Sequence, residues 1–569
     1  MSEAEAQSIS QQARRLHDQL IATPRLDERT RAHCSEELRR LRDLFRRNQS
    51  VFAADTLAML KQVADRLRSS ADDPTRALEV LEGTFGYRSF RAGQREIIQT
   101  VLSGRDCVGV MPTGAGKSLT FQLPARILSG TTLVISPLIA LMKDQVDALG
   151  EFGVRATFLN SLLTPAEKDE RVTRLRQGEY ELVYAAPEGI EASVGRALSG
   201  LNVPLIAIDE AHCISQWGHD FRPAYRNLRA LRRWFPKATL LALTATATGQ
   251  VTEDIVEQLS MHEPKLFRGS FFRPNLQLHA HRKGQTAGRS TRAAILALVR
   301  ERAGQSGIVY CLSRKSTEQI ADFLNANGCS AAAYHAGMEG SARSRVQDAF
   351  RDEKIDVVAA TIAFGMGIDK SNVRFVIHRD MPRSIEGYYQ EIGRAGRDGV
   401  ASDCVLFYSW SEVMAYDSFA EGSTDDEISA RSRSQAREMF QFAEARVCRH
   451  QGLVNYFGEA LGPCGSSCDV CRGVDLLAQH SAPKTKRRAV EKPESVDDLD
   501  TRLFERLKKI RRALADERKV PAYVVFSDAT LLEMVNARPQ TLSELAHISG
   551  VGPAKLERYG RHFLKELRS

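Results

Sequence analysis

The sequence predicts an α/β fold with two parallel-sheet domains in tandem, and two series of short apolar runs predict it. In each series, runs of β-branched and aliphatic residues alternate with helical stretches, a pattern typical of a parallel sheet covered by helices. The first series spans residues 76–272, and its runs are 107–110, 132–135, 182–184 and 205–208. The second series spans residues 273–410, and its runs are 307–310, 356–360 and 373–377.

Helical segments are predicted on both sides of this core. Residues 1–75 are rich in Arg, Glu, Leu and Ala at helical spacing, which predicts an N-terminal extension of unknown role. Residues 411–473 return to a helical pattern and end in a cluster of cysteines. Residues 474–497 have the polar, basic composition of a linker, and residues 498–569 have the pattern of a small all-α bundle.

The composition narrows the class of protein. The chain has 569 residues, of which 43% are hydrophobic and 26% charged, and these values exclude a disordered chain, a collagen-like fibre and a membrane bundle. A net charge of +8 permits a polyanionic partner, although a slightly basic solvated surface accounts for it equally well. Because the chain has no apolar run of membrane-spanning length and no signal-peptide core, we expect a soluble intracellular protein that acts away from membranes.

A glycine-rich loop follows the apolar run 107–110 and precedes a helical stretch, which is the context of a phosphate-binding loop. Gly114 and Gly116 let backbone amides approach phosphates, and the start of the following helix favours their charge. Lys117 can reach the β- and γ-phosphate oxygens, and Ser118 is placed to ligate Mg²⁺. The strict pattern of such loops has a glycine where Met111 stands, so this loop is an incomplete match and is not sufficient by itself to predict binding of ATP and Mg²⁺.

Two carboxylates complete this prediction. Asp209 and Glu210 directly follow the apolar run 205–208, so they lie at the edge of the sheet where such folds bind ligands. Asp209 can hold Mg²⁺ through water, and Glu210 can orient or deprotonate the attacking water. Cationic charge on the γ-phosphate often comes from another domain, and Arg394 and Arg397 of the second series offer it.

These segments resemble those of RecQ-type DNA helicases of superfamily 2. The resemblance spans about residues 80–472, and the matching motifs are FGYRSFRAGQ from Phe85, SPLIALMKDQ from Ser136, LTATA from Leu243, TIAFGMGIDK from Thr361 and QEIGRAGRDG from Gln390. It implies two RecA-like domains, with Gln94 reading the edge of the adenine base while Tyr87 and Arg91 sandwich its ring. The other nucleotide or catalytic residues that it implies are Thr113, Asp369, Gln390, Arg394 as a γ-phosphate contact, and Arg397 as the arginine finger.

A loop rich in aromatic residues follows the acidic pair and reads CISQWGHDFRP from Cys213. Bases stack on aromatic side chains, so a loop of this kind can sense a strand and signal to Glu210. A buried cluster of Trp and Phe is the structural alternative, but the position after the acidic pair and the resemblance favour DNA contact and coupling. The residues expected in this role are Gln216, Trp217, His219, Phe221 and Arg222.

Four cysteines, with 15, three and two residues between successive members, predict a tetrahedral Zn²⁺ site in an intracellular protein. They are Cys448, Cys464, Cys468 and Cys471. His450 is an open alternative ligand. The surrounding segment resembles the RecQ zinc subdomain, which usually has two residues between its second and third cysteines, whereas this chain has three. The site is expected to be structural.

Downstream of the cysteines the chain departs from the family pattern. Most family members have a winged-helix domain there, whereas here only the basic linker 474–497 intervenes. Its absence puts processive unwinding and duplex recognition in question, but leaves ATP hydrolysis untouched. Residues 498–569 resemble the HRDC domain, and the sequence leaves open whether this module binds DNA or protein.

The expected activity is that of an ATP- and Mg²⁺-dependent helicase that moves 3′ to 5′ on single-stranded DNA in recombination and repair. The expected substrates are single-stranded, tailed or forked DNA, and single-strand-binding or repair proteins are candidate partners. Two alternatives stay open: a DNA-stimulated ATPase that remodels or anneals DNA with little unwinding, and a non-enzymatic DNA-binding scaffold. The expected location is the nucleoid-associated cytoplasm of a bacterium or the nucleus of a eukaryote.

Overall fold

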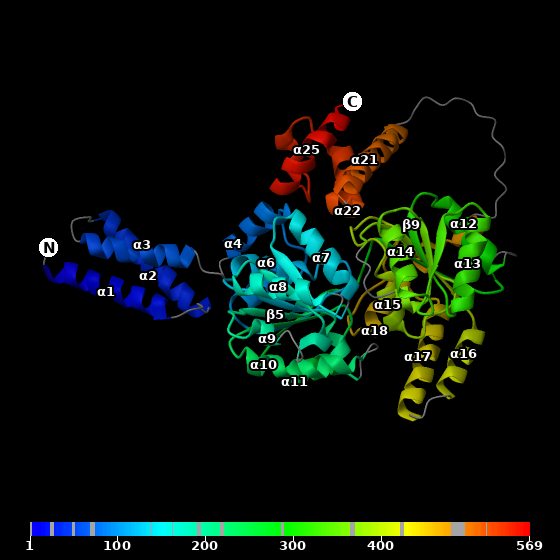
Figure 1. Ribbon diagram of the computed structural model, residues 1–569, viewed down its shortest axis with the longest axis horizontal. Helices are drawn as coiled ribbons and strands as arrows, with labels where there is room; N and C mark the ends of the chain where they lie inside the picture. The colour runs from blue at the N-terminus through cyan, green and yellow to red at the C-terminus, as the bar shows by residue number, and fades with distance from the viewer. Residues whose placement is uncertain are drawn as a thin grey trace.

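The computed structural model describes most of the chain. The described residues are 3–22, 28–47, 52–68, 74–137, 139–161, 163–190, 195–216, 221–285, 290–364, 370–421, 426–479, 496–518 and 520–568. Two α/β domains form the centre of the molecule, and a helical module lies at each end of the chain (Figure 1).

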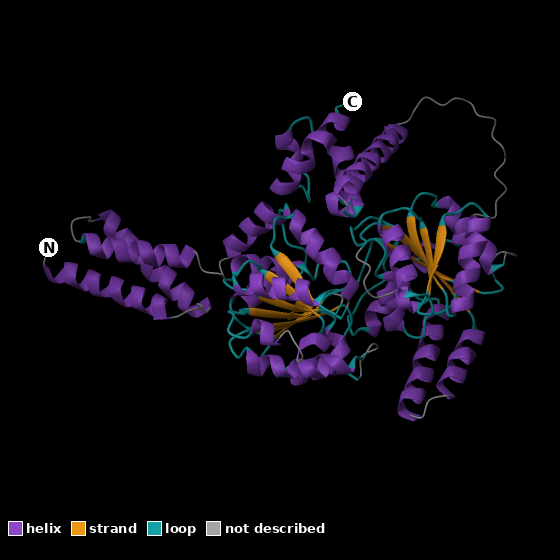
Figure 2. Ribbon diagram, in the orientation of Figure 1, coloured by secondary structure: helices purple, strands orange, loops and turns teal. Residues whose placement is uncertain are grey.

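The first α/β domain contains a seven-stranded parallel sheet of order β3-β4-β2-β5-β6-β1-β7. Its strands are β1 (Cys107–Val110), β2 (Thr132–Ile135), β3 (Ala156–Leu159), β4 (Leu182–Ala185), β5 (Leu205–Ile208), β6 (Thr239–Thr244) and β7 (Lys265–Arg268). Its helices are α4 (Pro74–Val80), α5 (Gln94–Leu102), α6 (Leu119–Ile127), α7 (Ile139–Glu151), α8 (Pro165–Arg176), α9 (Gly195–Leu198), α10 (Ala230–Trp234) and α11 (Gly249–Gln258). Helices cover the sheet on both faces, so its central strands are buried from end to end (Figure 2).

The second α/β domain contains a six-stranded parallel sheet of order β10-β11-β9-β12-β13-β8. Its strands are β8 (Leu276–Arg282), β9 (Ser306–Tyr310), β10 (Ala331–Tyr334), β11 (Val357–Ala360), β12 (Val373–His378) and β13 (Ser402–Tyr408). Its helices are α12 (Thr291–Glu301), α13 (Arg314–Ala326), α14 (Gly340–Arg351) and α15 (Ile385–Ile392). The first strand in the sequence, β8, therefore lies at the edge of the sheet beside the last strand, β13.

The remaining helices form smaller units. An N-terminal bundle with its own apolar core comprises α1 (Glu3–Ala22), α2 (Glu28–Arg47) and α3 (Ala54–Arg68). The segment after β13 contains α16 (Trp410–Glu421), α17 (Asp426–Glu444), α18 (Arg449–Tyr456), α19 (Asp469–Arg472) and α20 (Leu476–Gln479). The C-terminal module has a separate core and comprises α21 (Val496–Arg518), α22 (Ala522–Val525), α23 (Asp528–Ala537), α24 (Leu542–Leu545) and α25 (Pro553–Leu567).

The structure confirms the predicted class of two parallel α/β domains and adds strands that the sequence patterns did not single out. These are β3, β6, β7, β8, β10 and β13. The stretch expected to be a linker also begins with structure, because α20 forms within it and Leu477 is buried against the second sheet. Within the described part of the chain, no helix has the length and apolar character needed to cross a bilayer.

A buried carboxylate fixes one end of the first sheet. Asp106, just before β1, accepts hydrogen bonds from the amides of Leu240 (2.8 Å) and His262 (2.9 Å) and pairs with Arg232. Its side chain is 5% exposed. One side chain therefore joins the starts of β1 and β6 to the turn that leads into β7.

We expect Asp106→Ala to lower the free energy of unfolding of the first α/β domain by about 3 kcal/mol or more, because it leaves two buried amides and a guanidinium without their acceptor. Urea unfolding followed by circular dichroism measures the loss. Asp169→Ala, at an exposed position of α8, is the control and should leave the midpoint unchanged. A loss below about 1 kcal/mol in Asp106→Ala would contradict this role.

Candidate functional site

The glycine-rich loop lies between β1 and α6. Gly114 and Gly116 have φ angles of 82° and 80°, a left-handed conformation that favours glycine. A Cβ on Gly116 would also lie 2.4 Å from Nε2 of the Gln94 side chain, so a larger residue there would displace Gln94 from the loop. Lys117 Nζ donates to the carbonyl of Met111 (3.3 Å), which holds the ammonium over the loop. The loop therefore has the backbone form that a triphosphate requires.

Two residues of the motif that begins at Phe85 form hydrogen bonds to this loop with their side chains. Arg91 Nη1 donates to the carbonyl of Gly114 (2.5 Å). Gln94 Nε2 donates to the carbonyls of Ala115 (3.1 Å) and Gly116 (3.0 Å). Arg91 and Gln94 thus lie together at the loop, while their contact with adenine stays a prediction.

The acidic pair follows β5 at its carboxyl end. The amide of Asp209 donates to the carbonyl of Ile135 (2.8 Å), and the hydroxyl of Tyr225 donates to the carbonyl of Asp209 (2.9 Å). Glu210 has a φ of 49°, which is uncommon for a residue with a side chain, and its amide donates to Asp209 Oδ1 (3.0 Å). Burial raises the pKa of Tyr225 well above its usual value, so its hydroxyl remains a donor that fixes the turn.

A chain of polar contacts leads from this pair to the second domain. His212 Nδ1 lies 3.3 Å from Glu210 Oε2 and 2.9 Å from Thr244 Oγ1. Thr244 Oγ1 donates to the carbonyl of Thr246 (3.0 Å), and Gln390 Nε2 donates to Thr246 Oγ1 (3.4 Å). Of these residues, only Gln390 belongs to the second domain. The acidic pair and the second domain are therefore connected through β6.

Arg273 is a site residue to which the sequence analysis gave no role. Its guanidinium donates to the carbonyl of Thr113 (2.6 Å) in the glycine-rich loop and to the carbonyls of Ala395 (3.1 Å) and Gly396 (2.8 Å) in the second domain. Burial lowers the pKa of Arg273. The only sequence signal is an arginine at the domain boundary, in the segment FRPN, and that signal does not reveal which carbonyls it contacts.

The segment that carries the two arginines of the second domain lies against the same loop. The Cα of Arg397 is 3.3 Å from the position of a Cβ on Gly114, and a Cβ on Gly393 would lie 2.3 Å from Thr113 Oγ1. Arg394 is 9% exposed and lies beside Tyr310, whose pKa is raised by burial to about 12 although Arg394 opposes that shift.

Two hydrogen-bond donors, Thr113 Oγ1 and Arg394 Nε, are among the buried polar atoms that have no hydrogen-bond partner in the described residues, and so is the acceptor Glu210 Oε2. Buried polar atoms of this kind are costly unless a ligand pairs with them. The donor set therefore fits the phosphates of ATP, with Ser118 and Asp209 available for Mg²⁺.

The aromatic loop is described only in part. Gln216 is exposed. The Arg226 guanidinium lies over the Phe221 ring, with its carbon 5.0 Å from the ring centroid. Arg222 Nη1 donates to the carbonyl of Pro137 (3.3 Å). Arg222 therefore joins this loop to the segment that precedes α7. Trp217, His219 and the predicted nucleotide residue Asp369 lie outside the described residues.

The four cysteines meet at one point. The sulfur atoms of Cys448, Cys464, Cys468 and Cys471 all lie within 4.8 Å of one another, the grouping that a tetrahedral Zn²⁺ requires. Backbone amides support the sulfurs: the amide of Cys464 donates to Cys448 Sγ (3.2 Å), and that of Cys471 donates to Cys468 Sγ (3.4 Å). The extra residue between the second and third cysteines does not displace any of the four from the group.

His450 contacts backbone rather than the sulfur group. Its Nε2 lies 3.0 Å from the carbonyl of Leu276 and 3.2 Å from that of Ser467, which argues against His450 as the alternative ligand. The cysteine segment is also joined to β8, because the amide of Leu278 donates to Ser467 (3.0 Å) and that of Ala280 donates to Asp469 (2.9 Å). The metal centre therefore lies at the edge of the second sheet.

We expect Cys468→Ser to lower the zinc content of the purified protein from about one equivalent to less than half, because three thiolates bind the ion far more weakly than four. Elemental analysis measures the content, and thermal unfolding should show a less stable second domain. Cys329→Ser, which changes a cysteine outside the group, should retain the full equivalent. Full zinc content in Cys468→Ser would remove that residue from the ligand set.

Models of four known protein families match segments of the chain. Family models match for DEAD/DEAH box helicase at residues 91–255, helicase conserved C-terminal domain at 290–399, RecQ zinc-binding at 410–472 and HRDC domain at 500–567. The chain is similar to the Mycobacterium smegmatis helicase Lhr bound to ssDNA and AMP-PNP, with a TM-score of 0.47 and 17% identity over 80% of this chain and 73% of that one.

Two curated relatives match over most of their length. The ATP-dependent DNA helicase RecQ of Pasteurella multocida is 37% identical over 86% of this chain and 93% of that protein. The protein of the same name from Bacillus subtilis is 37% identical over 87% of this chain and 98% of that protein. With the nucleotide loop, the acidic pair and the four-cysteine group in place, the chain belongs to the RecQ family of ATP-dependent DNA helicases.

Proposed function

We propose that the chain hydrolyses ATP to move 3′ to 5′ along single-stranded DNA and to separate short duplexes. The observation that carries the proposal is the contact between the two α/β domains at the glycine-rich loop, where Arg273 joins Thr113 to Ala395 and Gly396. A site divided between two domains changes when they separate, and this is how hydrolysis is converted into movement.

Each residue of the cleft has a role in the proposed hydrolysis. ATP with Mg²⁺ supplies the phosphoanhydride bond that is cleaved. Lys117 and the loop amides would hold its phosphates, Ser118 would ligate Mg²⁺, and Asp209 would hold Mg²⁺ through water. Glu210 orients or deprotonates the water, while Arg397, with Arg394 beside it, stabilises charge that develops on the γ-phosphate.

The polar chain from Glu210 to Gln390 supports coupling between hydrolysis and domain movement. His212, Thr244 and Thr246 lie between the two residues, so a shift of the second domain reaches the acidic pair through short contacts. The aromatic loop lies directly after this pair, and Arg222 ties it to the segment before α7. We assign strand sensing to Gln216, Trp217, His219, Phe221 and Arg222, and nucleotide contact to Tyr87 and Asp369.

The domain assignment follows the same proposal. Residues 76–272 and 273–410 form the motor, 411–473 carry Zn²⁺ and 498–569 form the HRDC-like module. Single-stranded, tailed and forked DNA are the proposed substrates, and single-strand-binding or repair proteins are proposed partners. Recombination and repair are the processes in which such an enzyme would act.

Arg397→Ala is expected to lower the turnover of ATP by about three orders of magnitude or more, because the arginine finger acts mainly on the transition state. Steady-state hydrolysis with single-stranded DNA measures this, and binding of a fluorescent ATP analogue should change little. Arg345→Ala, at an exposed position of α14, is the matched control and should keep wild-type turnover. Wild-type turnover in a folded Arg397→Ala protein would remove Arg397 from the role.

Strand displacement on short duplexes with a 3′ or a 5′ single-stranded tail tests the direction of movement. We expect displacement only from the 3′ tail, and none in Lys117→Ala, which cannot hold the phosphates. Displacement from the 5′ tail alone would overturn the proposed polarity. Strong DNA-stimulated hydrolysis without displacement would instead favour the remodelling or annealing ATPase.

A further inference from the structure

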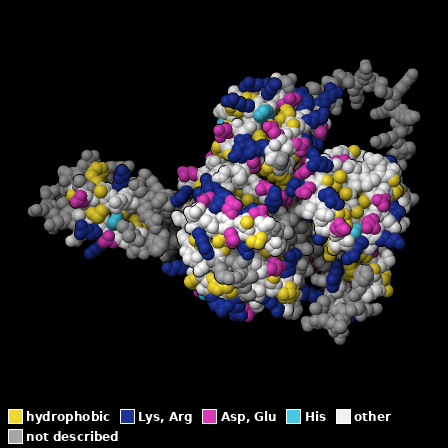
Figure 3. Space-filling model, in the orientation of Figure 1, with side chains coloured by type: hydrophobic (Ala, Val, Ile, Leu, Met, Phe, Trp, Pro, Cys, Tyr) yellow, Lys and Arg dark blue, Asp and Glu magenta, His cyan; other side chains and the backbone are white. Residues whose placement is uncertain are grey.

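The C-terminal module lies against both motor domains. In Figure 1 its helices lie above the two α/β domains, although Leu477 of the preceding α20 packs in the core of the second domain. Lys and Arg side chains gather on this module in Figure 3. Several of its cations face carboxylates of the motor, so those cations are not available to DNA phosphates while the module is docked.

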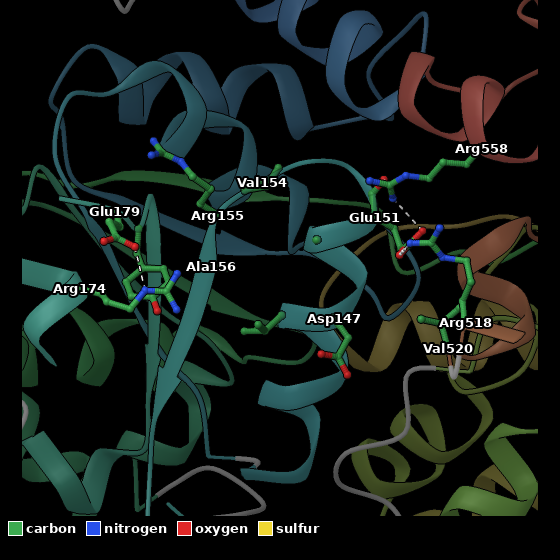
Figure 4. Close-up of a pocket in the computed structure, with 13 residues that line it drawn as sticks. Asp147, Glu151, Val154, Arg155, Ala156, Arg174, Glu179, Arg518, Val520 and Arg558 are labelled. Carbon is green, nitrogen blue, oxygen red and sulfur yellow. Dashed lines mark hydrogen bonds and ion pairs between the residues drawn. The ribbon is translucent and has the colours of Figure 1, made fainter. Parts of the chain in front are cut away.

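The contact with the first domain is centred on Glu151, the last residue of α7. Its carboxylate accepts hydrogen bonds from Tyr559 (2.6 Å), Arg558 (3.0 Å) and Arg518 (3.2 Å), and it is 8% exposed (Figure 4). Burial alone would raise the pKa of Glu151, but the Tyr559 hydroxyl and the two guanidinium groups outweigh it, and the pKa is lowered. All three donors come from the module, from α21 and α25.

A backbone contact joins the module to the first domain within the motif that begins at Phe85. The amide of Gly550 donates to the carbonyl of Gly86 (3.2 Å), and a Cβ on Gly86 would lie 2.3 Å from the amide nitrogen of Gly552. Gly86 has a φ of 73°, so both conformation and space require glycine there. Gly86 precedes Tyr87, and a Cβ on Gly550 would lie 3.9 Å from the Tyr87 ring.

The contact with the second domain is centred on Glu353. Its carboxylate pairs with Lys370 (3.4 Å) of its own domain and with Arg511 (3.5 Å) and Arg512 (3.7 Å) of the module. Burial would raise the pKa of Glu353, but Lys370 and Arg511 bring it down to about 2. Lys370 ends the motif that begins at Thr361, so the module lies next to a helicase motif here too.

A second pair extends this contact to the arginine-finger segment. Asp528 of the module accepts a hydrogen bond from Arg511 (2.7 Å) and lies 3.7 Å from Arg374 Nε. Arg374 in turn pairs with Asp398, the residue after Arg397. The module is therefore connected, through Arg374 and Asp398, to the residue that we place on the γ-phosphate.

The interface contains many polar contacts, which is typical of a contact that opens. Ion pairs and hydrogen bonds anchor the module at Glu151 and Glu353, and an open pocket of about 630 Å³ lies between α7, β3 and the module. Arg155 and Arg174 of the first domain line one side of this pocket, and Arg518 and Arg558 of the module line the other (Figure 4). Interfaces of this kind within one chain allow the parts to separate.

We propose that the C-terminal module is a releasable clamp on the motor, which holds the two α/β domains in the closed arrangement and thereby slows the release of nucleotide. This inference rests on the proposed ATP cycle. The clamp joins Glu151 of one domain to Glu353 of the other, in parallel with the direct contacts of Arg273 and of the Arg351–Asp144 pair (3.1 Å). Opening of the cleft requires one anchor of the clamp to break.

The test is the release of a fluorescent ADP analogue from the full chain without DNA. We expect Arg518→Glu/Arg558→Glu to raise the rate of dissociation by about three- to tenfold, because two cations at Glu151 become repulsive. The matched control is Lys509→Glu/Arg561→Glu, which makes the same charge change at exposed positions of the same two helices and should leave the rate within about twofold. Adding Glu151→Arg to the first variant reverses the pairing and should restore the slow rate.

Hydrogen exchange shows whether the clamp has opened. In Arg518→Glu/Arg558→Glu, peptides that contain Gly86 and Gly550 should exchange faster than in the control variant. Faster exchange with an unchanged rate of ADP release would overturn the proposal. Equal exchange in both variants would also overturn it, because the contact between the module and the first domain would then not depend on the pairs of Glu151 with Arg518 and Arg558. Loss of DNA-stimulated hydrolysis in the wild-type chain would overturn the proposed function instead, because the ADP measurement contains no DNA.

Discussion

The guanidinium of Arg273 is the contact on which the arrangement of the nucleotide site depends. One planar group donates to a carbonyl of the glycine-rich loop and to two carbonyls of the segment that carries Arg394 and Arg397. Lysine could not replace it, because an ammonium lacks the rigid fork that spans separate acceptors. When the two loops separate, buried donors and acceptors lose their partners, so the closed and open arrangements are distinct states rather than a continuum.

Much of the motor could be predicted from local sequence, and the reason is physical. The buried strands β1, β2 and β5 are short continuous apolar runs, and the glycine-rich loop and the acidic pair follow such runs directly. β7 escaped prediction because three of its four residues are exposed, which leaves no apolar pattern to detect. The position of Arg273, the contact of His450 with Leu276 and the dock on Glu151 all depend on residues far apart in the chain, and no spacing in the sequence encodes them.

Apolar contacts and polar contacts have different roles in this molecule. One face of each sheet, the N-terminal bundle and the C-terminal module each have a separate apolar core. A further apolar cluster runs through both α/β domains and the cysteine segment. Between the motor and the C-terminal module, carboxylates meet arginines, and partly exposed ion pairs contribute little free energy each. The C-terminal module is therefore folded by burial of apolar side chains, but it is docked on the motor by contacts that water can replace.

The place of β8 has a consequence for synthesis of the chain on the ribosome. This strand opens the second domain in the sequence, but its partner in the sheet is β13, and its backbone also bonds to Ser467 beside the cysteines. Residues 276–282 therefore emerge long before the segments that pair with them, and an unpaired strand edge is a site of aggregation. β8 stays without its partner strand until β13 is made, and its outer edge stays without its hydrogen bonds to Ser467 and Asp469 until the cysteine segment follows, so a chain interrupted between these points exposes that edge.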